Sequence, residues 1–253
     1  MTNTSAADTL ANRVILVTGA ANGIGAAIST NFAREGAHVV GCDVNWPESK
    51  SLEYPTFAIL TCDLSDPVAV EEMVSEVLTR YEKIDVLVNN AGIVVKGNLA
   101  EINLAQSTRV ISVNLIAPLH LMSAVIPHMK ARHYGRIINV ISRAAERCPP
   151  GMSSYAATKA GLYALSVSVA KEVHDSGILV NCLIPGPVSS SMNPLGTNSP
   201  ESVYPTARWL ASLPDNGPTG GVYWDMKQYP LYKSNRPDGQ VTVDPSVARV
   251  EVS

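Results

Sequence analysis

Short apolar runs rich in β-branched residues alternate with longer segments of helical periodicity from Arg13 to about Ile184. Alternation of this kind is typical of βαβ units, in which each helix carries the chain back to start the next parallel strand. Continuous apolar strands must be covered on both faces, so helices have to lie above and below one sheet. The pattern therefore predicts an α/β fold with a doubly wound parallel sheet. The expected strands are residues 14–17, 38–42, 57–62, 86–89, 136–141 and 179–184.

The helical segments and the rest of the chain indicate one domain over residues 1–253. The main expected helices are residues 25–35, 68–81 and 115–132, and no internal repeat or linker divides the chain. After Pro185 the pattern loosens into a loop and then predicts a helix around 203–213 and a short strand at 222–224. Residues 227–253 are polar and carry prolines without periodicity, and we expect a polar C-terminal extension there.

Composition narrows the choice of partner. The net charge of −3 provides no basic field for nucleic acid or an anionic membrane. No run approaches the roughly 20 apolar residues of a membrane span, and the start MTNTSAADTL lacks the parts of a signal peptide. We expect a soluble, cytoplasmic protein that binds a small molecule. Cys42, Cys62, Cys148 and Cys182 have no metal-ligand spacing, so we expect buried free thiols and no metal site.

A glycine-containing loop, TGAANGIG, runs from Thr18 to Gly25, directly after the first expected strand and directly before a helix. Such a turn presents backbone N–H groups and the positive end of a helix dipole, and glycines let a pyrophosphate approach closely. The spacing G-x3-G-x-G differs from the common G-x-G-x-x-G, and a tight turn needs glycine whether or not it binds a ligand. The position of the loop therefore supports a dinucleotide site more than the glycines do.

An acid ends the second expected strand. Asp43 follows Gly23 by 20 residues, where a carboxylate accepts hydrogen bonds from both ribose hydroxyls of an adenosine and repels a 2′-phosphate. No Arg or Lys lies between Thr18 and Gly25 or immediately after Asp43. The alternative is that the acid only terminates a strand. Loop and acid together predict NAD rather than NADP.

Tyr155 and Lys159 are four residues apart in a helical segment, so their side chains lie on one face. A nearby ammonium favours the phenolate and lowers the pKa of a tyrosine toward the range of a general acid or base. Ser142 lies at the carboxyl end of an expected strand, where ligands bind in open parallel sheets. A surface Tyr–Lys contact and a turn-capping serine explain each feature separately, so the prediction depends on the whole set.

Together these motifs resemble the short-chain dehydrogenase/reductase family over roughly residues 10 to 190. The resemblance implies a single Rossmann-like sheet of about seven strands with helices on both faces, assembled as a homodimer or homotetramer. The segment GPTGGVYWDMK resembles the C-terminal part of carbonyl-reductase-like members. The motifs that carry the resemblance are the loop from Thr18 to Gly25, Asp63-Leu64, Asn89-Asn90-Ala91-Gly92, Asn114 in SVNL, Ser142, Tyr155-x-x-x-Lys159 and Pro185-Gly186.

The resemblance also implies the chemistry. Tyr155 would exchange a proton with the alcohol or ketone oxygen while hydride passes to or from the nicotinamide, and Ser142 would polarise that oxygen. Lys159 would hold the nicotinamide ribose and lower the pKa of Tyr155, and Asn114 would hold a water for proton relay. The implied cofactor-binding residues are Gly19, Asn22, Gly23, Ile24, Gly25, Asp43, Asp63, Leu64, Asn90, Ala91, Gly92, Tyr155, Lys159, Pro185, Gly186 and Val188.

Three functions are compatible with this set. The leading one is an NAD-dependent alcohol dehydrogenase or ketoreductase that acts on a secondary alcohol or its ketone. The second is an NADPH-dependent ketoreductase of a biosynthetic pathway, against which Asp43 argues. The third is a non-catalytic nicotinamide-binding redox sensor, which has no evident need for the complete set of proton-transfer residues.

Two details of the site have alternatives. One residue of the serine run 189–191 would replace the threonine that usually follows Pro185-Gly186. Arg143 and Arg147 either bind an anionic group of the substrate or face water or an acid such as Glu146.

Replacing Asp43 with alanine tests the cofactor assignment. Asp43→Ala removes the charge that repels a 2′-phosphate, so the preference for NAD over NADP should narrow. The measurement is the ratio of kcat/KM for the two cofactors in wild type and variant. An unchanged ratio would show that the acid does not read the ribose.

Overall fold

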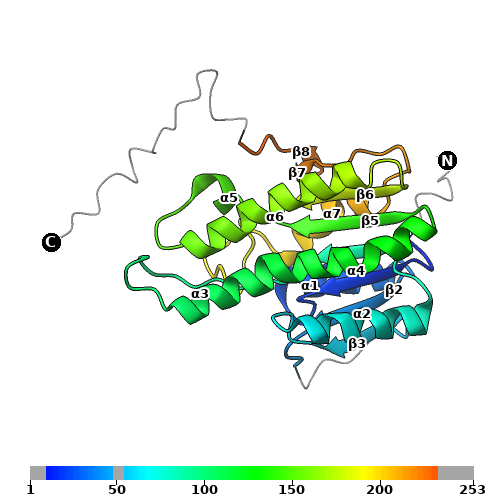
Figure 1. The fold of residues 1–253 in the computed structure, drawn as a ribbon, viewed down its shortest axis with the longest axis horizontal. Coiled ribbons are helices and arrows are strands. Elements are labelled where there is room, and N and C mark those ends of the chain that lie inside the picture. Colours follow the sequence, from blue (N-terminus) through cyan, green and yellow to red (C-terminus); the bar gives the residue numbers. More distant parts are fainter. Residues whose placement is uncertain (1–9, 48–53, 233–253) are drawn as a thin grey trace.

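The strands form one eight-stranded sheet at the centre of the molecule, of which the computed structural model describes residues 10–47 and 54–232 (Figure 1). The strands are β1 (Val14–Thr18), β2 (His38–Asp43), β3 (Phe57–Thr61), β4 (Val86–Asn89), β5 (Gly135–Val140), β6 (Ile178–Leu183), β7 (Val222–Trp224) and β8 (Lys227–Gln228). Their order is β3-β2-β1-β4-β5-β6-β7-β8, and the first seven run parallel. In this Rossmann-like order, successive strands are added on one side of β1 and then on the other side, beginning with β4. Ligands of doubly wound sheets bind at this switch point between β1 and β4.

Burial explains why these runs form strands. Every residue of β1, β4, β5 and β6 is buried, which accounts for their mostly apolar sequences, and the buried polar residues Arg136, Asn139 and Asn181 are hydrogen-bonded. The predicted strands agree with the observed ones to within one residue at each end. β8 is an additional strand, so the expected number of about seven becomes eight.

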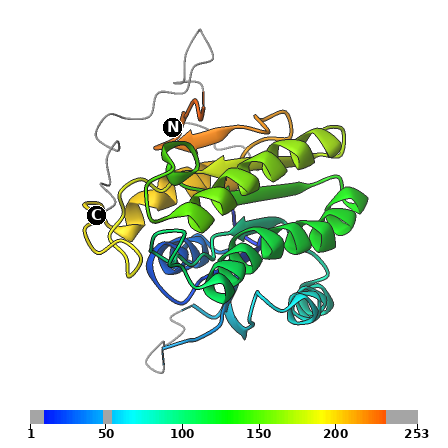
Figure 2. The same cartoon turned by 60° about the vertical axis from the view of Figure 1, so that its left-hand side comes forward.

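Helices cover both faces of the sheet. α1 (Gly23–Arg34) and α7 (Tyr204–Ala211) pack on one face, and α2 (Pro67–Tyr81), α4 (Ala117–Ala131) and α6 (Ser153–Glu172) pack on the other (Figure 2). The remaining helical segments are α3 (Leu104–Ile111), the π-helical η2 (Ser112–Ile116), the short α5 (Ala144–Arg147) and the 3₁₀ segment η3 (Pro200–Val203). Because both faces are covered, ligands can reach the strands only at their ends.

One continuous helix spans Leu104–Ala131 and contains α3, η2 and α4. By length and composition it could cross a membrane, although the sequence shows no uninterrupted apolar run of that length. Leu121, Met122 and Val125 on its inner face are buried between the sheet and the neighbouring helices. In this fold it is a core helix of the domain.

The first residues of the expected polar extension are ordered parts of the fold. β8 pairs antiparallel with β7 through Tyr223–Gln228 and Trp224–Lys227, and Leu231 is buried in an apolar cluster. The sequence predicted no element after residue 224, so β8 and the burial of Leu231 are additions to the expected extension. A two-residue strand has no periodicity to detect, because its pairing depends on a neighbour that the local sequence does not show. Residues 233–253 lie outside the described part.

A buried acid organises the end of the sheet at which the central strands β1 and β4 begin. Asp85 is 1% exposed and accepts a hydrogen bond from Val14 N at 2.9 Å. Its carboxylate lies 2.7 Å from Lys83 Nζ, 3.2 Å from an Arg132 nitrogen and 3.8 Å from an Arg13 nitrogen. The acid thus links the start of β1 to three cations around the start of β4.

Removing this acid should destabilise the fold. Asp85→Ala leaves a backbone N–H without its acceptor and three cations without their partner, so the free energy of unfolding should fall by about 3 kcal/mol. Urea denaturation measures the change. Asp175→Ala is the control, since that carboxylate is 96% exposed beside His174 and should contribute almost nothing. Equal effects of both substitutions would contradict the role of Asp85.

Candidate functional site

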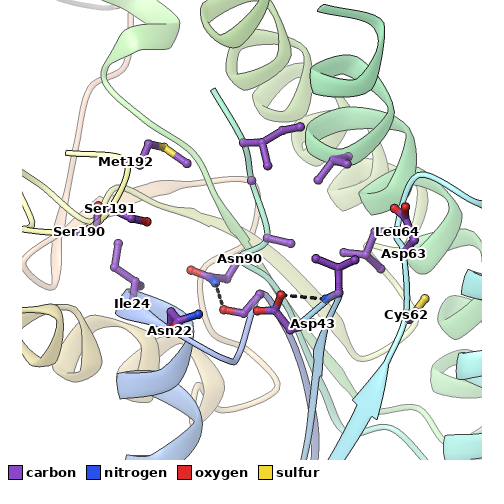
Figure 3. A pocket seen from close by; sticks show the side chains of 18 of the residues that line it. Asn22, Ile24, Asp43, Cys62, Asp63, Leu64, Asn90, Ser190, Ser191 and Met192 are labelled. Carbon is purple, nitrogen blue, oxygen red and sulfur yellow. Dashed lines mark hydrogen bonds between the residues drawn. The ribbon is translucent and has the colours of Figure 1, made fainter. Parts of the chain in front are cut away.

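The loop between β1 and α1 forms the floor of the site. Gly19 and Gly23 have φ angles of +66° and +54°, in the left-handed region that favours glycine. A Cβ on Gly25 would lie 2.0 Å from the Gly19 carbonyl oxygen, so this glycine is required for the first turn of α1 to pack on the loop. Asn90 Nδ2, at the end of β4, donates to Gly19 O at 3.1 Å (Figure 3). The fold itself therefore favours glycine at these three positions, whether or not a ligand binds.

Asp43 closes one side of this floor. Its Oδ2 accepts from Ala21 N at 3.0 Å. Its Oδ1 accepts from Val44 N at 2.8 Å, the bond from Asp43 that Figure 3 draws. The carboxylate is thus fixed beside the glycine loop and faces the cavity above it. An acid held there is placed to receive hydroxyl donors from a ligand.

A cavity of about 660 Å³ lies over the loop and the ends of β1, β2 and β4 (Figure 3). Eleven of the predicted cofactor residues line it: Gly19, Asn22, Gly23, Ile24, Gly25, Asp43, Asp63, Leu64, Asn90, Ala91 and Gly92. The lining residues that the sequence did not predict are Val44, Cys62, Ile93, Arg109, Val113 and Met192, whereas Ser190 and Ser191 belong to the serine run expected near the cofactor. We call this the first cavity.

Asp63 and Arg109 form the rim of the first cavity. Asp63 accepts from the backbone N–H and the hydroxyl of Ser65 and from Arg109 Nη2, which donates at 2.9 Å. The bonds from Ser65, followed by the arginine, hold the pKa of Asp63 below its ordinary value. The sequence did not predict Arg109 as a site residue, because the helix expected in this region began only at Leu115. The available signal was Asn103, whose side chain caps α3 by accepting from Gln106 N.

A second cavity of about 280 Å³ adjoins the first, and Ile24, Asn90, Gly92, Ser190 and Met192 line both. The structure brings six predicted residues together here: Ser142, Tyr155, Lys159, Pro185, Gly186 and Val188. The residues that the sequence did not predict are Lys96, Val140, Ile141, Met152 and Asn193, besides the shared Met192. A ligand bound at the glycine loop would thus extend through the adjoining cavity to Tyr155.

Tyr155 and Lys159 lie at the bottom of the second cavity. Tyr155 is 9% exposed, and burial raises its pKa, while a hydrogen bond with Ser142 opposes the rise. Lys159 Nζ lies 5.8 Å from the centre of the Tyr155 ring and donates to Val140 O at 2.8 Å. Burial lowers the pKa of this lysine to about 8.

The expected effect of the lysine on the tyrosine is not what this structure shows. The pKa of Tyr155 was expected to fall because of Lys159, but loss of solvation outweighs the other influences and raises it. The lysine is itself buried, and its bonded partner is a backbone carbonyl of β5. The arrangement therefore holds a neutral phenol, with Ser142 as the group that eases its ionisation.

Asn114 lies behind the cavities, and its place in the π-helical turn η2 aims its amide at the chain after β4. Its Oδ1 accepts from Ile93 N at 2.9 Å, and its Nδ2 donates to Ile93 O at 2.9 Å and to Thr158 Oγ1 at 3.2 Å. A Cβ on Gly92 would lie 3.5 Å from both Asn114 Oδ1 and Lys159 Nζ. The side chain supports the site without lining either cavity.

The structure shows where the serine run 189–191 and the two arginines of the sequence alternatives lie. Ser190 lines both cavities and Ser191 the first, whereas Ser189 lines neither. Arg143 and Arg147 also line neither cavity, so the anionic-substrate alternative gains no support from the geometry.

Side chains that commonly bind metals are not clustered in the described part of the chain. Among the described residues, no group of three or more His, Cys, Asp or Glu side chains is arranged to hold a metal. Cys42, Cys62 and Cys182 are buried and free as expected. Cys148 is exposed, so the expectation of burial is wrong there, because the chain leaves α5 through a left-handed turn at that residue.

Comparison with known proteins agrees with this geometry. The family model described as short chain dehydrogenase matches residues 13–199. The 3-oxoacyl-[acyl-carrier-protein] reductase FabG of Thermotoga maritima is 33% identical over 235 residues, covering 84% of this chain and 96% of that protein. The short-chain dehydrogenase/reductase olcF of Penicillium canescens is 39% identical over 185 residues, covering 72% of each chain.

A solved structure shares the fold. The crystal structure of a metagenomic short-chain oxidoreductase in complex with NADP superposes with a TM-score of 0.74 and 32% sequence identity. The match covers 82% of this chain and 94% of that chain. The matched family model, the identity over most of the length and the common fold lead to one conclusion. This chain belongs to the short chain dehydrogenase family of oxidoreductases.

Proposed function

We propose that this protein interconverts a secondary alcohol and its ketone with NAD(H), and that Asn114, Ser142, Tyr155 and Lys159 carry the chemistry. The observation that supports this most directly is the convergence of Ser142, Tyr155 and Lys159 on a cavity that adjoins the one bordered by Asp43. Ketone reduction needs a hydride donor in one cavity and a proton donor in the other, and alcohol oxidation needs the corresponding two acceptors.

The residues of the first cavity fit a dinucleotide. The side chain of Asn22 makes no capping bond at the start of α1 within the described residues, so the N–H groups of that turn remain available for a pyrophosphate. Asp43 would receive the adenosine ribose, and Asp63 and Leu64 would border the adenine. Asn90, Ala91, Gly92, Pro185, Gly186 and Val188 would line the nicotinamide side. When bound, the nicotinamide would supply or accept the hydride.

The protein residues would handle the proton. In ketone reduction the Tyr155 hydroxyl would donate its proton to the substrate oxygen, while Ser142 donates a hydrogen bond to the same oxygen. Lys159 would hold the nicotinamide ribose, and Asn114 would hold a water from which the proton is replaced. The raised pKa of Tyr155 keeps the phenol protonated at neutral pH, which suits it as the acid.

A second function is a candidate, with a different cofactor form and substrate. Asp43, fixed by two backbone donors, supports NAD, whereas the solved relative is in complex with NADP and the Thermotoga maritima relative is named a 3-oxoacyl-[acyl-carrier-protein] reductase. An NADPH-dependent ketoreductase is therefore the alternative. As part of the proposal, the protein is a cytoplasmic homodimer or homotetramer.

A panel of substrates tests the proposal. Acetoacetate, ethyl acetoacetate, cyclohexanone and acetophenone would be supplied with NADH or NADPH, and their alcohols with the oxidised forms, while reduced-nicotinamide absorbance is followed. Tyr155→Phe should lose nearly all turnover, at least about a hundredfold, because no proton donor remains. NADH binding, followed by fluorescence, should be nearly unchanged. Turnover that survives the substitution would refute the assignment, and NADH binding without any turnover would favour the redox sensor.

The two directions should differ in their dependence on pH. Alcohol oxidation needs the Tyr155 phenolate, so its kcat/KM should rise with pH through the neutral and alkaline range, whereas ketone reduction should stay flat until the phenol ionises. Ser142→Ala removes the bond that eases ionisation and should shift both profiles to higher pH. Ser154→Ala is the matched control, because that buried hydroxyl has no partner among the described residues. Identical profiles for the two variants would contradict the role of Ser142.

A further inference from the structure

The last described segment crosses the loops that carry two residues of the proposed site. We call residues 224–232 the C-terminal strap. It begins at the end of β7, turns through Asp225 and Met226, both with positive φ, and pairs back on β7 as β8. Met226 N donates to Thr206 Oγ1 on α7 at 3.0 Å. Leu231 then packs against Ile141 and other apolar side chains, which fixes the far end of the strap.

The strap contacts the loop after β5 through several side chains. The Tyr229 hydroxyl donates a hydrogen bond to Glu146 Oε1 on α5. The Tyr232 hydroxyl donates to the Ala145 carbonyl at 2.9 Å. The Arg143 guanidinium carbon lies 5.1 Å from the centre of the Trp224 ring. Three residues of one short loop are thus contacted from outside by one segment.

That loop also carries Ser142. The Ser142 hydroxyl accepts from Ala144 N at 3.1 Å, and the Ser142 carbonyl accepts from Ala145 N at 3.0 Å. The direction of the serine side chain therefore depends on the first turn of α5. The strap also covers the other loop of the site, since a Cβ on Gly186 would lie 2.9 Å from Trp224 Nε1.

Glu146 is the group whose position depends most on the strap. Its side chain is 8% exposed, and Arg143 Nε is 3.7 Å away, beyond normal hydrogen-bond length. Its Oε2 has no hydrogen-bond partner among the described residues. The tyrosine hydroxyl is therefore the one close donor that the structure gives this buried carboxylate, and its removal would force the acid toward water.

We propose that Tyr229 and Glu146 are positioning residues that hold the loop from Ser142 to Cys148 so that the Ser142 hydroxyl stays beside Tyr155. This inference depends on the proposed role of Ser142 in the reaction. Neither residue touches a reacting atom in the proposal. Their effect on turnover passes through the serine, and the C-terminal segment thereby becomes part of the active-site structure.

Tyr229→Phe removes the hydroxyl and keeps the ring. With NADH and the panel ketone that is reduced fastest, kcat should fall about tenfold, while the KM of the ketone and the affinity for NADH stay within about twofold. In a Ser142→Ala background the same substitution should cause no further loss, because the group through which it acts is already absent. Glu146→Gln keeps an acceptor for the tyrosine and should retain activity, whereas Glu146→Ala should behave like Tyr229→Phe.

Tyr204→Phe is the matched control. Tyr204 donates to Glu35 Oε1 at 2.7 Å, and Arg208 contacts the same carboxylate at 2.9 Å, so the same three residue types meet outside both cavities of the site. This variant should lose stability without a change in kcat. Amide hydrogen exchange followed by mass spectrometry adds a measurement that needs no substrate. Tyr229→Phe should speed exchange in peptides covering residues 142–148, and Tyr204→Phe should not.

The outcomes separate the two proposals. If Ser142→Ala leaves kcat unchanged, the proposed role of the serine fails. If Ser142→Ala lowers kcat but Tyr229→Phe does not, the inference about the strap is wrong. It is also wrong if the two single effects multiply in the double variant, or if exchange in residues 142–148 is the same as in wild type.

Discussion

The hydrogen bonds that join the ends of β1 and β4 decide where the rest of the site lies. Thr18 Oγ1 accepts from Asn90 N and Ala91 N, each at 3.1 Å, and Asn90 Nδ2 donates to Thr18 O at 2.9 Å. At this point the sheet reverses its winding direction, so the chain leaves the two strands on opposite faces and opens a crevice between them. The crossed bonds fix the width of that crevice. Both cavities border Asn90 and Gly92, which directly follow β4.

A buried polar layer holds helix α6 in register with the sheet. Asn89 Nδ2 donates to Asn139 Oδ1 at 2.7 Å, and Asn139 Nδ2 donates to Ser166 Oγ at 2.8 Å. Ser166 is on α6, two turns beyond Lys159, so these bonds link β4, β5 and α6 directly. Apolar packing alone tolerates small sliding of a helix, whereas buried polar groups must keep their partners. The layer therefore fixes the height of Tyr155 and Lys159 above the strand ends.

Much of the site could be predicted because its parts follow local rules. A buried parallel strand needs a continuous apolar run, and the residues that follow its end face the ligand, so Asp43, Asn90 and Ser142 could be placed from position alone. Arg109, Lys96 and Met192 could not be placed in this way. They reach the cavities from helices or loops whose paths depend on contacts with other elements, and each has an ordinary surface explanation in the sequence.

The C-terminal segment also could not be placed from its local sequence. Residues 227–232 read as a polar tail, yet they pair with β7 and insert Leu231 into the core. Nothing in a two-residue strand distinguishes it until the edge that it pairs with is in place. For Arg143, one alternative was an anionic group of the substrate, but in the structure it lies beside Glu146 in a cluster with Trp224 and Tyr229.

The sequence by itself determined the doubly wound sheet, the crevice at the strand ends and the presence there of Ser142, Tyr155 and Lys159, because periodicity and spacing act within one element or between neighbours in the chain. Only the tertiary structure decided the ionisation state that Tyr155 favours, the residues that complete the cavities and the strap over α5. These depend on burial and on contacts between segments distant in the sequence. Desolvation in particular depends on every atom packed around a group, and no local pattern records it.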